Sequence, residues 1–201
     1  MHLLEGPMFG GKTTTLIGLY EYHNGVDRAR PTLIKARRDT RYGPTAVIPH
    51  GQPRSSGWEA NCVVDRLSEA DIGKAHTVLI DELHFFDADN FTDTLRTLRK
   101  WYLQGILVVA TTLNKGSDGK DFFKFRLDAA QIPYTVQLVR GKCAYPGCSK
   151  ESEMTARTAA FDGNWVGGQE AYQPCCAEHH AVMDVFVAPE ALVSNWGELA
   201  A

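Results

Sequence analysis

The chain has 201 residues, of which 44% are hydrophobic and 22% charged, and its formal net charge is −3. These values are typical of a globular protein with one substantial core, or with a main domain and a small appendage. There is no basic surplus to bind nucleic acid, no apolar run near the roughly 20 residues of a membrane span, and no signal-peptide pattern after Met1. We therefore expect a cytoplasmic protein with neither nucleic acid nor a membrane as partner.

The first part of the chain alternates short apolar runs with a helical pattern. Residues 1–4 and 32–34 are predicted strands, and between them residues 12–23 carry apolar side chains at helical spacing. Residues 37–60 are rich in Gly, Pro, Ser and Arg, which favours an irregular loop region.

A phosphate-binding motif lies between the first strand and the first helix. Residues 6–13 fit the pattern G-x-x-x-x-G-K-[ST]. In this motif backbone N–H groups and the helix N-terminus attract phosphate oxygens, the lysine (Lys12) reaches the β- and γ-phosphates, and the hydroxyl of Thr13 binds Mg²⁺. The predicted ATP-binding residues are Gly6, Pro7, Met8, Phe9, Gly10, Gly11, Lys12, Thr13, Thr14 and Asp81.

The carboxylates of that site follow a second apolar strand. Residues 77–80 form a continuous apolar run, typical of a strand buried on both faces, and Asp81 and Glu82 come directly after it. Since ligands bind at the carboxyl ends of parallel strands, Asp81 is predicted to hold Mg²⁺ near the phosphate motif. Glu82 would activate water in an ATPase, or would be the base of a kinase if it faced an acceptor hydroxyl. The spacing leaves both roles open.

The later segments complete an α/β pattern and then change in character. Residues 91–102 are a predicted helix and residues 105–110 a further buried strand, so the chain favours a mostly parallel sheet flanked by helices. From residue 136 onward cysteines, glycines and prolines accumulate. We predict a nucleotide-binding domain at 1–138, a small zinc-binding lobe at 139–187 and a C-terminal tail at 188–201.

Four of the five cysteines lie in that lobe. Cys143 and Cys148 are separated by four residues, and Cys176 and His179 by two, and both spacings suit structural zinc. A closed tetrahedral Zn²⁺ site would organise the lobe without taking part in chemistry. Cys175 could replace Cys176 and His180 could replace His179, so the exact ligand set stays open at this point.

Four segments, taken in their order along the chain, form a recognisable combination. They are the motif at 6–13, residues 35–42, residues 80–86, and residues 166–172 followed by the second metal pair. His50 fits a histidine-containing stretch after residue 42. Together they resemble the zinc-containing, cytosolic-type thymidine kinases over roughly residues 3–180. The resemblance implies a P-loop NTPase-like (RecA-like) sheet and a zinc-ribbon lobe whose lasso loop, about residues 149–172, closes over a nucleoside.

The resemblance also implies a reaction and its residues. ATP would phosphorylate the 5′-hydroxyl of a deoxynucleoside, most simply thymidine, to give ADP and dTMP. Glu82 would accept the proton of that hydroxyl, while Lys12 and Arg41 would steady the phosphates. The family is commonly tetrameric, which implies a homo-oligomer. The implied nucleoside-binding residues are Met8, His84, Phe85, Leu113, Phe122, Thr155, Val166, Gly168 and Tyr172.

Three features depart from the family pattern. His84 stands where the family usually has Gln, the first metal pair is wider than the usual two-residue gap, and Ser117 replaces a phenylalanine that stacks on the base if no gap is inserted. A lost aromatic stack, about 1–3 kcal/mol per base in nucleic-acid systems, predicts weakened or redirected base selection unless Phe122 or Phe123 takes its place. The alternatives are a kinase for a different or modified pyrimidine deoxynucleoside, a P-loop ATPase acting on a macromolecule through its zinc lobe, and an inactive nucleotide-binding relative.

Overall fold

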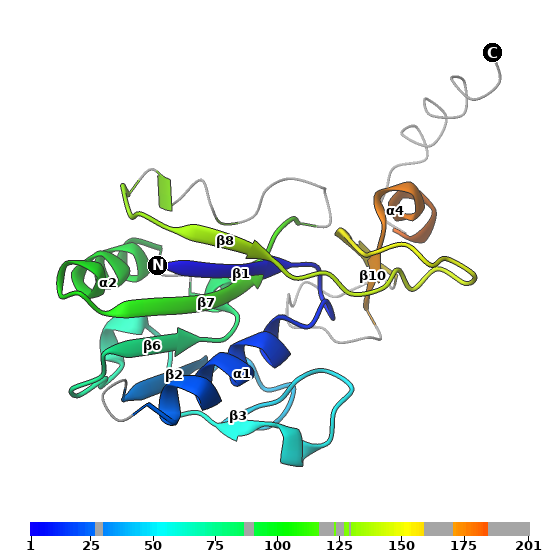
Figure 1. The fold of residues 1–201 in the computed structure, drawn as a ribbon. Coiled ribbons are helices and arrows are strands. Elements are labelled where there is room, and N and C mark those ends of the chain that lie inside the picture. The colour runs from blue at the N-terminus through cyan, green and yellow to red at the C-terminus, as the bar shows by residue number, and fades with distance from the viewer. Residues whose placement is uncertain are drawn as a thin grey trace.

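The structure is a computed structural model that describes residues 1–26, 30–86, 91–116, 123, 127–128, 130–158 and 171–184. Its main element is a six-stranded sheet in the order β5-β2-β6-β7-β1-β8, and every neighbouring pair of strands is parallel (Figure 1). The expected α/β class with a mostly parallel sheet is confirmed. The strands are β1 His2–Gly6, β2 Pro31–Ala36, β5 Cys62–Val64, β6 Thr77–Ile80, β7 Leu107–Leu113 and β8 Thr135–Leu138.

Two helices cover opposite faces of this sheet. Successive side chains of a strand point to opposite faces, so Leu3 and Leu4 of β1 enter different hydrophobic clusters. Leu4 packs with Leu16 of helix α1 (Lys12–Asn24), whereas Leu3 packs with Trp101 of helix α2 (Phe91–Leu103). This double burial explains why the central strands are nearly continuous apolar runs.

The region at residues 37–60 is mostly irregular, as expected, but it contains a small antiparallel pair. Strand β3 (Ala46–Val47) pairs with β4 (Trp58–Glu59), and the 3-10 turn η1 (Arg54–Ser56) lies between them. Two further 3-10 turns are η2 (Leu67–Glu69) and η3 (Leu83–Phe86). The turn η3 follows directly after the acidic pair at the end of β6.

Beyond β8 the chain forms a separate two-stranded element. Strand β9 (Met154–Arg157) runs antiparallel to β10 (Tyr172–Cys175), and helix α4 (Ala177–Met183) follows. No helix was predicted here from the sequence. The boundary after Leu138 remains a proposal, and the predicted tail at 188–201 lies outside the described residues.

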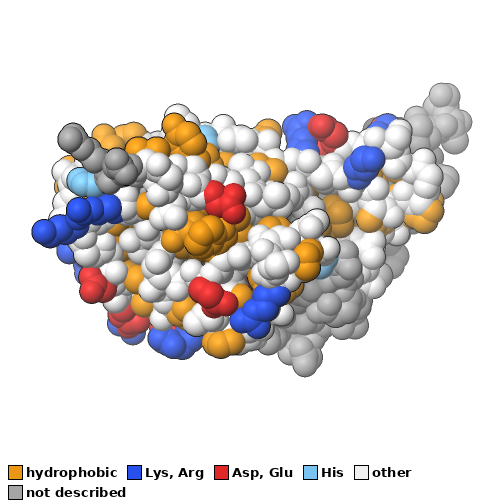
Figure 2. Space-filling view, turned by 60° about the horizontal axis from the view of Figure 1, so that its bottom comes forward, with side chains coloured by type: hydrophobic (Ala, Val, Ile, Leu, Met, Phe, Trp, Pro, Cys, Tyr) orange, Lys and Arg blue, Asp and Glu red, His pale blue; other side chains and the backbone are white. Residues whose placement is uncertain are grey.

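On the face drawn in Figure 2, Lys, Arg, Asp and Glu side chains are interspersed around an apolar patch. This mixture agrees with the small net charge of −3. None of the helices in the described part of the chain has the length and apolar character needed to cross a bilayer.

Candidate active site and metal centre

The sheet topology gathers the predicted nucleotide-binding residues at one edge. In parallel strands all carboxyl ends lie at the same edge, and β7 lies between β1 and β6. The predicted phosphate loop, residues 6–11, begins at the last residue of β1, and Asp81 and Glu82 follow β6. The end of β7 therefore separates the loop from the two carboxylates, and Thr111 lies there.

The phosphate loop is tightly curled around the ammonium group of Lys12. Phe9 and Gly11 have positive φ angles of 60° and 96°, which turn the backbone into the start of α1. The buried Lys12 Nζ donates hydrogen bonds to the carbonyl oxygens of Gly6 at 3.1 Å and Pro7 at 2.7 Å. Burial lowers the pKa of Lys12 despite the nearby carboxylates. A bound phosphate would offer this ammonium a stronger, charged acceptor.

Asp81 is held by hydroxyl groups from the two neighbouring elements. Its Oδ1 accepts hydrogen bonds from Thr13 Oγ1 at 3.1 Å and from Thr111 Oγ1 at 2.8 Å. Burial, followed by the adjacent charge of Glu82, raises the pKa of Asp81 to about 6. Thr111 Oγ1 also accepts a hydrogen bond from the Glu82 backbone N–H at 2.7 Å, so it fixes both acidic residues. Sequence reasoning missed Thr111, although a threonine near the end of a buried strand was a usable signal.

Glu82 lies in a chain of charged groups. Its φ angle is 51°, a strained value for a residue other than glycine. The Arg41 guanidinium donates one hydrogen bond to Glu82 Oε1 at 3.0 Å. It donates two more to the Asp39 carboxylate, at 2.8 and 3.1 Å. Burial opposes the charge of Glu82, but Arg41, His84 and Lys12 together lower the pKa of the carboxyl group. Lys35 Nζ lies 3.8 Å from Asp39 Oδ2, so the row of charged groups continues into the core. Neither Asp39 nor Lys35 was among the site residues predicted from the sequence.

Lys12, Arg41, Asp81 and Glu82 face a common cleft at the carboxyl edge of the sheet. Besides Arg41, three residues from the irregular 37–60 region form part of its wall, namely Tyr42, Ile48 and His50. The Tyr42 hydroxyl and His50 Nδ1 are hydrogen-bonded at 2.7 Å, and the His50 ring contacts the Phe9 ring with centroids 4.0 Å apart. The remaining lining residues are Met8, Phe9, Gly10, Gly11, Lys12, Thr13, Thr14, Arg41, Asp81 and Glu82.

Some of the predicted nucleoside-binding residues meet near this cleft. His84 Nδ1 lies 3.6 Å from Glu82 Oε2, and burial lowers the pKa of His84 to about 4, which keeps the imidazole neutral at pH 7. The rings of His84 and Phe85 lie 4.6 Å apart, and the Arg41 guanidinium lies 5.6 Å from the Phe85 ring centroid. The Met8 backbone N–H donates to Thr155 Oγ1 at 2.9 Å.

The other nucleoside-binding candidates are less directly placed. Leu113 ends β7 opposite Gly6, and Tyr172 begins β10 with its side chain buried and an Arg157 guanidinium 5.9 Å from its ring centroid. Three further candidates, Phe122, Val166 and Gly168, lie outside the described residues, as does Ser117.

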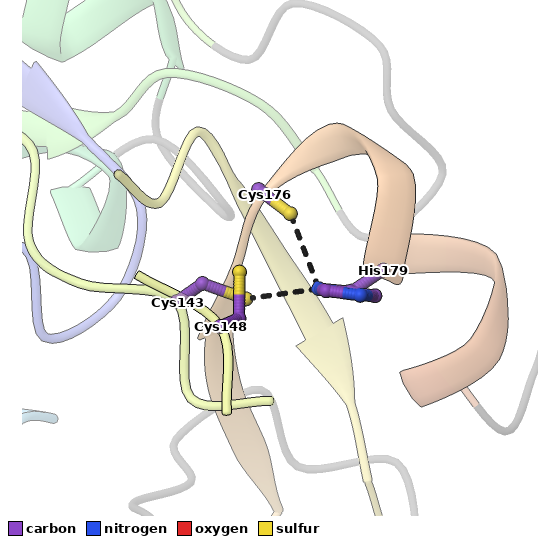
Figure 3. A group of neighbouring side chains, drawn as sticks. All are labelled: Cys143, Cys148, Cys176 and His179. Atoms are coloured by element: carbon purple, nitrogen blue, oxygen red, sulfur yellow. Dashed lines mark hydrogen bonds between the residues drawn. The ribbon is translucent and has the colours of Figure 1, made fainter. Parts of the chain in front are cut away.

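The metal-ligand candidates converge in the C-terminal lobe (Figure 3). The ligand atoms of Cys143, Cys148, Cys176 and His179 all lie within 4.8 Å of one another. His179 Nδ1 is 3.3 Å from Cys176 Sγ and 3.6 Å from Cys143 Sγ. Tetrahedral zinc with bond lengths of about 2.3 Å to sulfur and 2.0 Å to nitrogen requires S···N separations of about 3.5 Å, so these side chains fit Zn²⁺.

The alternative ligands point elsewhere. Cys175 Sγ contacts the Met154 carbonyl oxygen at 3.6 Å, and His180 Nε2 lies 3.4 Å from Asp184 Oδ2. The Tyr145 ring stacks on His179 with centroids 3.9 Å apart. Of the ligand sets that the sequence left open, only the set with Cys176 and His179 forms a four-ligand cluster among the residues that the structure describes.

Comparison with known proteins adds an independent finding. The thymidine kinase family model matches residues 1–180, and thus includes the phosphate loop, the acidic pair and all four metal ligands. The chain belongs to the thymidine kinase family.

The relatives support this membership over most of the chain. A protein named thymidine kinase from Thermococcus kodakarensis is 30% identical over 193 residues, which cover 92% of this chain and 95% of that protein. One from Oryza sativa subsp. japonica is 28% identical over 90% of this chain, which spans only 65% of the rice protein. One from Sheeppox virus is 25% identical, covering 88% of this chain and 93% of the viral protein.

Proposed function

We propose that this member of the thymidine kinase family transfers the γ-phosphate of ATP to the 5′-hydroxyl of a deoxynucleoside, in the first place thymidine. The observation that carries the proposal is the position of the Glu82 carboxylate, which lies in one cleft with the phosphate loop and Arg41. A base beside the phosphate site is the arrangement that in-line transfer to an alcohol requires. The relatives named thymidine kinase support the choice of nucleoside.

In this proposal Arg41 changes partners during the reaction. Its guanidinium is shared between Asp39 and Glu82. The triphosphate carries more negative charge than Glu82 and would draw the Arg41 guanidinium toward the transferred phosphoryl group. Glu82 would then lose the cation that lowers its pKa and become a stronger acceptor for the proton of the sugar hydroxyl. Lys12 would exchange its two loop carbonyl acceptors for phosphate oxygens.

Thr13 and Asp81 would hold Mg²⁺, because their oxygen atoms lie 3.1 Å apart beside the phosphate loop. Oxygen ligands of this kind suit Mg²⁺, which when bound neutralises charge on the β- and γ-phosphates.

We further propose that zinc in the lobe has only a structural role, and that the protein is a homo-oligomer, a tetramer by family resemblance.

The test is a screen of ATP consumption with purified, zinc-replete protein. Natural and 5-substituted pyrimidine nucleosides would be offered, with purine nucleosides as controls. We expect one monophosphate formed per ATP consumed with thymidine. Preference for another pyrimidine would redirect the proposal to that base, whereas ATP hydrolysis without any nucleoside, stimulated by DNA or RNA, would replace it with the ATPase alternative.

The two hydrogen bonds between Asp39 and Arg41 give a first prediction. The Asp39→Asn variant keeps the shape of the side chain but removes the charge from a two-point contact. Since hydrogen bonds to charged groups contribute about 1.5–3 kcal/mol, we expect kcat to fall about tenfold to hundredfold. Asp65→Asn is the matched control, because Asp65 pairs with Arg37 at the surface, where both side chains are more than 60% exposed. Equal rates for the two variants would contradict the proposed role of Asp39.

Titration of Asp81 gives a second prediction. Its pKa is raised to about 6, so the carboxyl group takes up a proton as the pH falls from 7 through 6, and the charge that attracts Mg²⁺ disappears. We therefore expect the advantage of Mg·ADP over metal-free ADP in binding affinity to shrink between pH 7 and pH 5.5. Calorimetry with and without Mg²⁺ measures this difference. In Asp81→Asn the advantage should be small at every pH, and an advantage independent of pH in the unaltered protein would contradict the assignment.

A further inference from the structure

The phosphate loop is hydrogen-bonded to a residue that is distant in sequence. Thr155 lies in β9 and its side chain is 3% exposed. Its Oγ1 accepts a hydrogen bond at 2.9 Å from the backbone N–H of Met8, which is 147 residues away in sequence. Met8 lies in the middle of the loop, so this hydrogen bond fixes a peptide beside the backbone N–H groups that are expected to face phosphate.

The segment that leads from β8 toward the lobe, residues 139–141, also lies close to the loop. The chain that leaves β8 crosses the end of β1 before it enters the lobe (Figure 1). A Cβ atom on Gly6 would lie 2.0 Å from the Val139 carbonyl oxygen, and one on Gly10 would lie 2.9 Å from the same atom. A Cβ atom on Gly141 would lie 3.2 Å from the Phe9 carbonyl oxygen. These glycines are therefore needed for contact with the lobe's entry segment, besides any approach to phosphate.

Thr155 lies close to the metal-ligand candidates along the β9–β10 pair. In the β9–β10 pair Thr155 lies opposite Pro174, and Met154 lies opposite Cys175. The next residue along the chain is the metal-ligand candidate Cys176. Zinc bound to Cys176 would order β10 and, through the strand pairing, β9, so only a few residues separate the ligand candidate Cys176 from Thr155.

We propose that Thr155 is a positioning residue for the phosphate loop, and that its hydroxyl couples an ordered zinc lobe to nucleotide binding. The hydroxyl fixes the Met8 peptide in one orientation before nucleotide arrives, so binding costs less conformational entropy. The family resemblance places Thr155 near the nucleoside base, and the proposal gives it a second role at the nucleotide. This second role rests on the proposed function only in that the loop must bind ATP.

The test compares Thr155→Val, which keeps the side-chain shape but removes the hydroxyl, with Thr155→Ser, which keeps it. ADP affinity would be measured by calorimetry without any nucleoside, with zinc content and melting temperature recorded for both variants. We expect the Kd of Thr155→Val for ADP to rise about three- to tenfold, the range set by one lost hydrogen bond, while Thr155→Ser stays near the unaltered protein. Thr155→Val with an unchanged Kd for ADP and a raised KM for thymidine would overturn the proposal, leaving Thr155 in the nucleoside pocket alone.

A second measurement needs no variant and applies even if Thr155→Val loses its zinc. Amide hydrogen exchange of residues 6–11 would be followed in the unaltered protein with and without a zinc chelator. We expect the Met8 amide to exchange at least about tenfold faster without zinc, because its acceptor is released. Unchanged exchange would overturn the coupling. Both readouts are independent of nucleoside phosphorylation, so failure of the kinase proposal would be recognised separately in the nucleoside screen.

Discussion

Replacing Glu82 by Gln is expected to lower kcat by about a hundredfold or more, while ADP binds as tightly as before or more tightly. Loss of a general base typically costs about 10²–10⁴ in rate, and glutamine cannot accept the proton of the sugar hydroxyl. Binding should not suffer, because Arg41 loses a charged competitor to the phosphates when the Glu82 carboxylate is removed. Steady-state kinetics with thymidine and calorimetry with Mg·ADP measure the two effects separately.

The matched control for this variant is Glu59→Gln. Glu59 is also paired with an arginine, Arg54 at 3.2 Å, but its side chain is 60% exposed and it lies on β4, outside the residues that line the cleft. Its kinetics should match those of the unaltered protein. If Glu82→Gln turned over thymidine at an unchanged rate, Glu82 would be removed from the mechanism, and another proton acceptor would have to be found in the cleft.

Removal of zinc is expected to abolish turnover and to unfold the C-terminal lobe. The small cluster around the metal-ligand candidates contains Cys143, Ala156, Cys175 and Cys176, which is little apolar surface for an independent core. Structural zinc in comparably small domains supplies an apparent 10–16 kcal/mol, roughly the whole folding free energy of the unit. We therefore expect Cys176→Ser to lose zinc, to melt at a lower temperature, and to turn over thymidine at least about a hundredfold more slowly.

Cys62→Ser provides the control for chemical replacement of a cysteine. Cys62 lies in β5 and its Sγ contacts the Asp71 carbonyl oxygen, far in sequence from the lobe. This variant should keep one zinc per chain and an unchanged turnover number. Metal analysis, thermal melting and steady-state kinetics follow the two variants together. A Cys176→Ser protein that retained stoichiometric zinc and its melting temperature would show that Cys176 is not a ligand.

The sequence predicted the elements whose patterns are local. The continuous apolar runs at β1, β6 and β7, and the helical spacing of α1 and α2, depend on neighbours a few residues away. The phosphate motif and the acidic pair after β6 followed from the same local patterns. The short strand β5 and the edge strand β8 escaped prediction, because β5 has three residues and all four residues of β8 are exposed. Helix α4 was missed because its seven residues are too short to show a period.

By itself, then, the sequence determined the class of the fold, and it predicted the phosphate loop with its acidic partners and the residue types of the metal centre. Only the tertiary structure decided that Thr111 fixes both acidic residues, that Asp39 holds Arg41, and that Thr155 reaches Met8. It also distinguished Cys176 from Cys175 as the ligand candidate. The Cys176 thiol points toward His179, whereas the Cys175 thiol points toward the Met154 carbonyl oxygen. Such choices depend on contacts between distant segments, and those contacts exist only once the sheet has assembled.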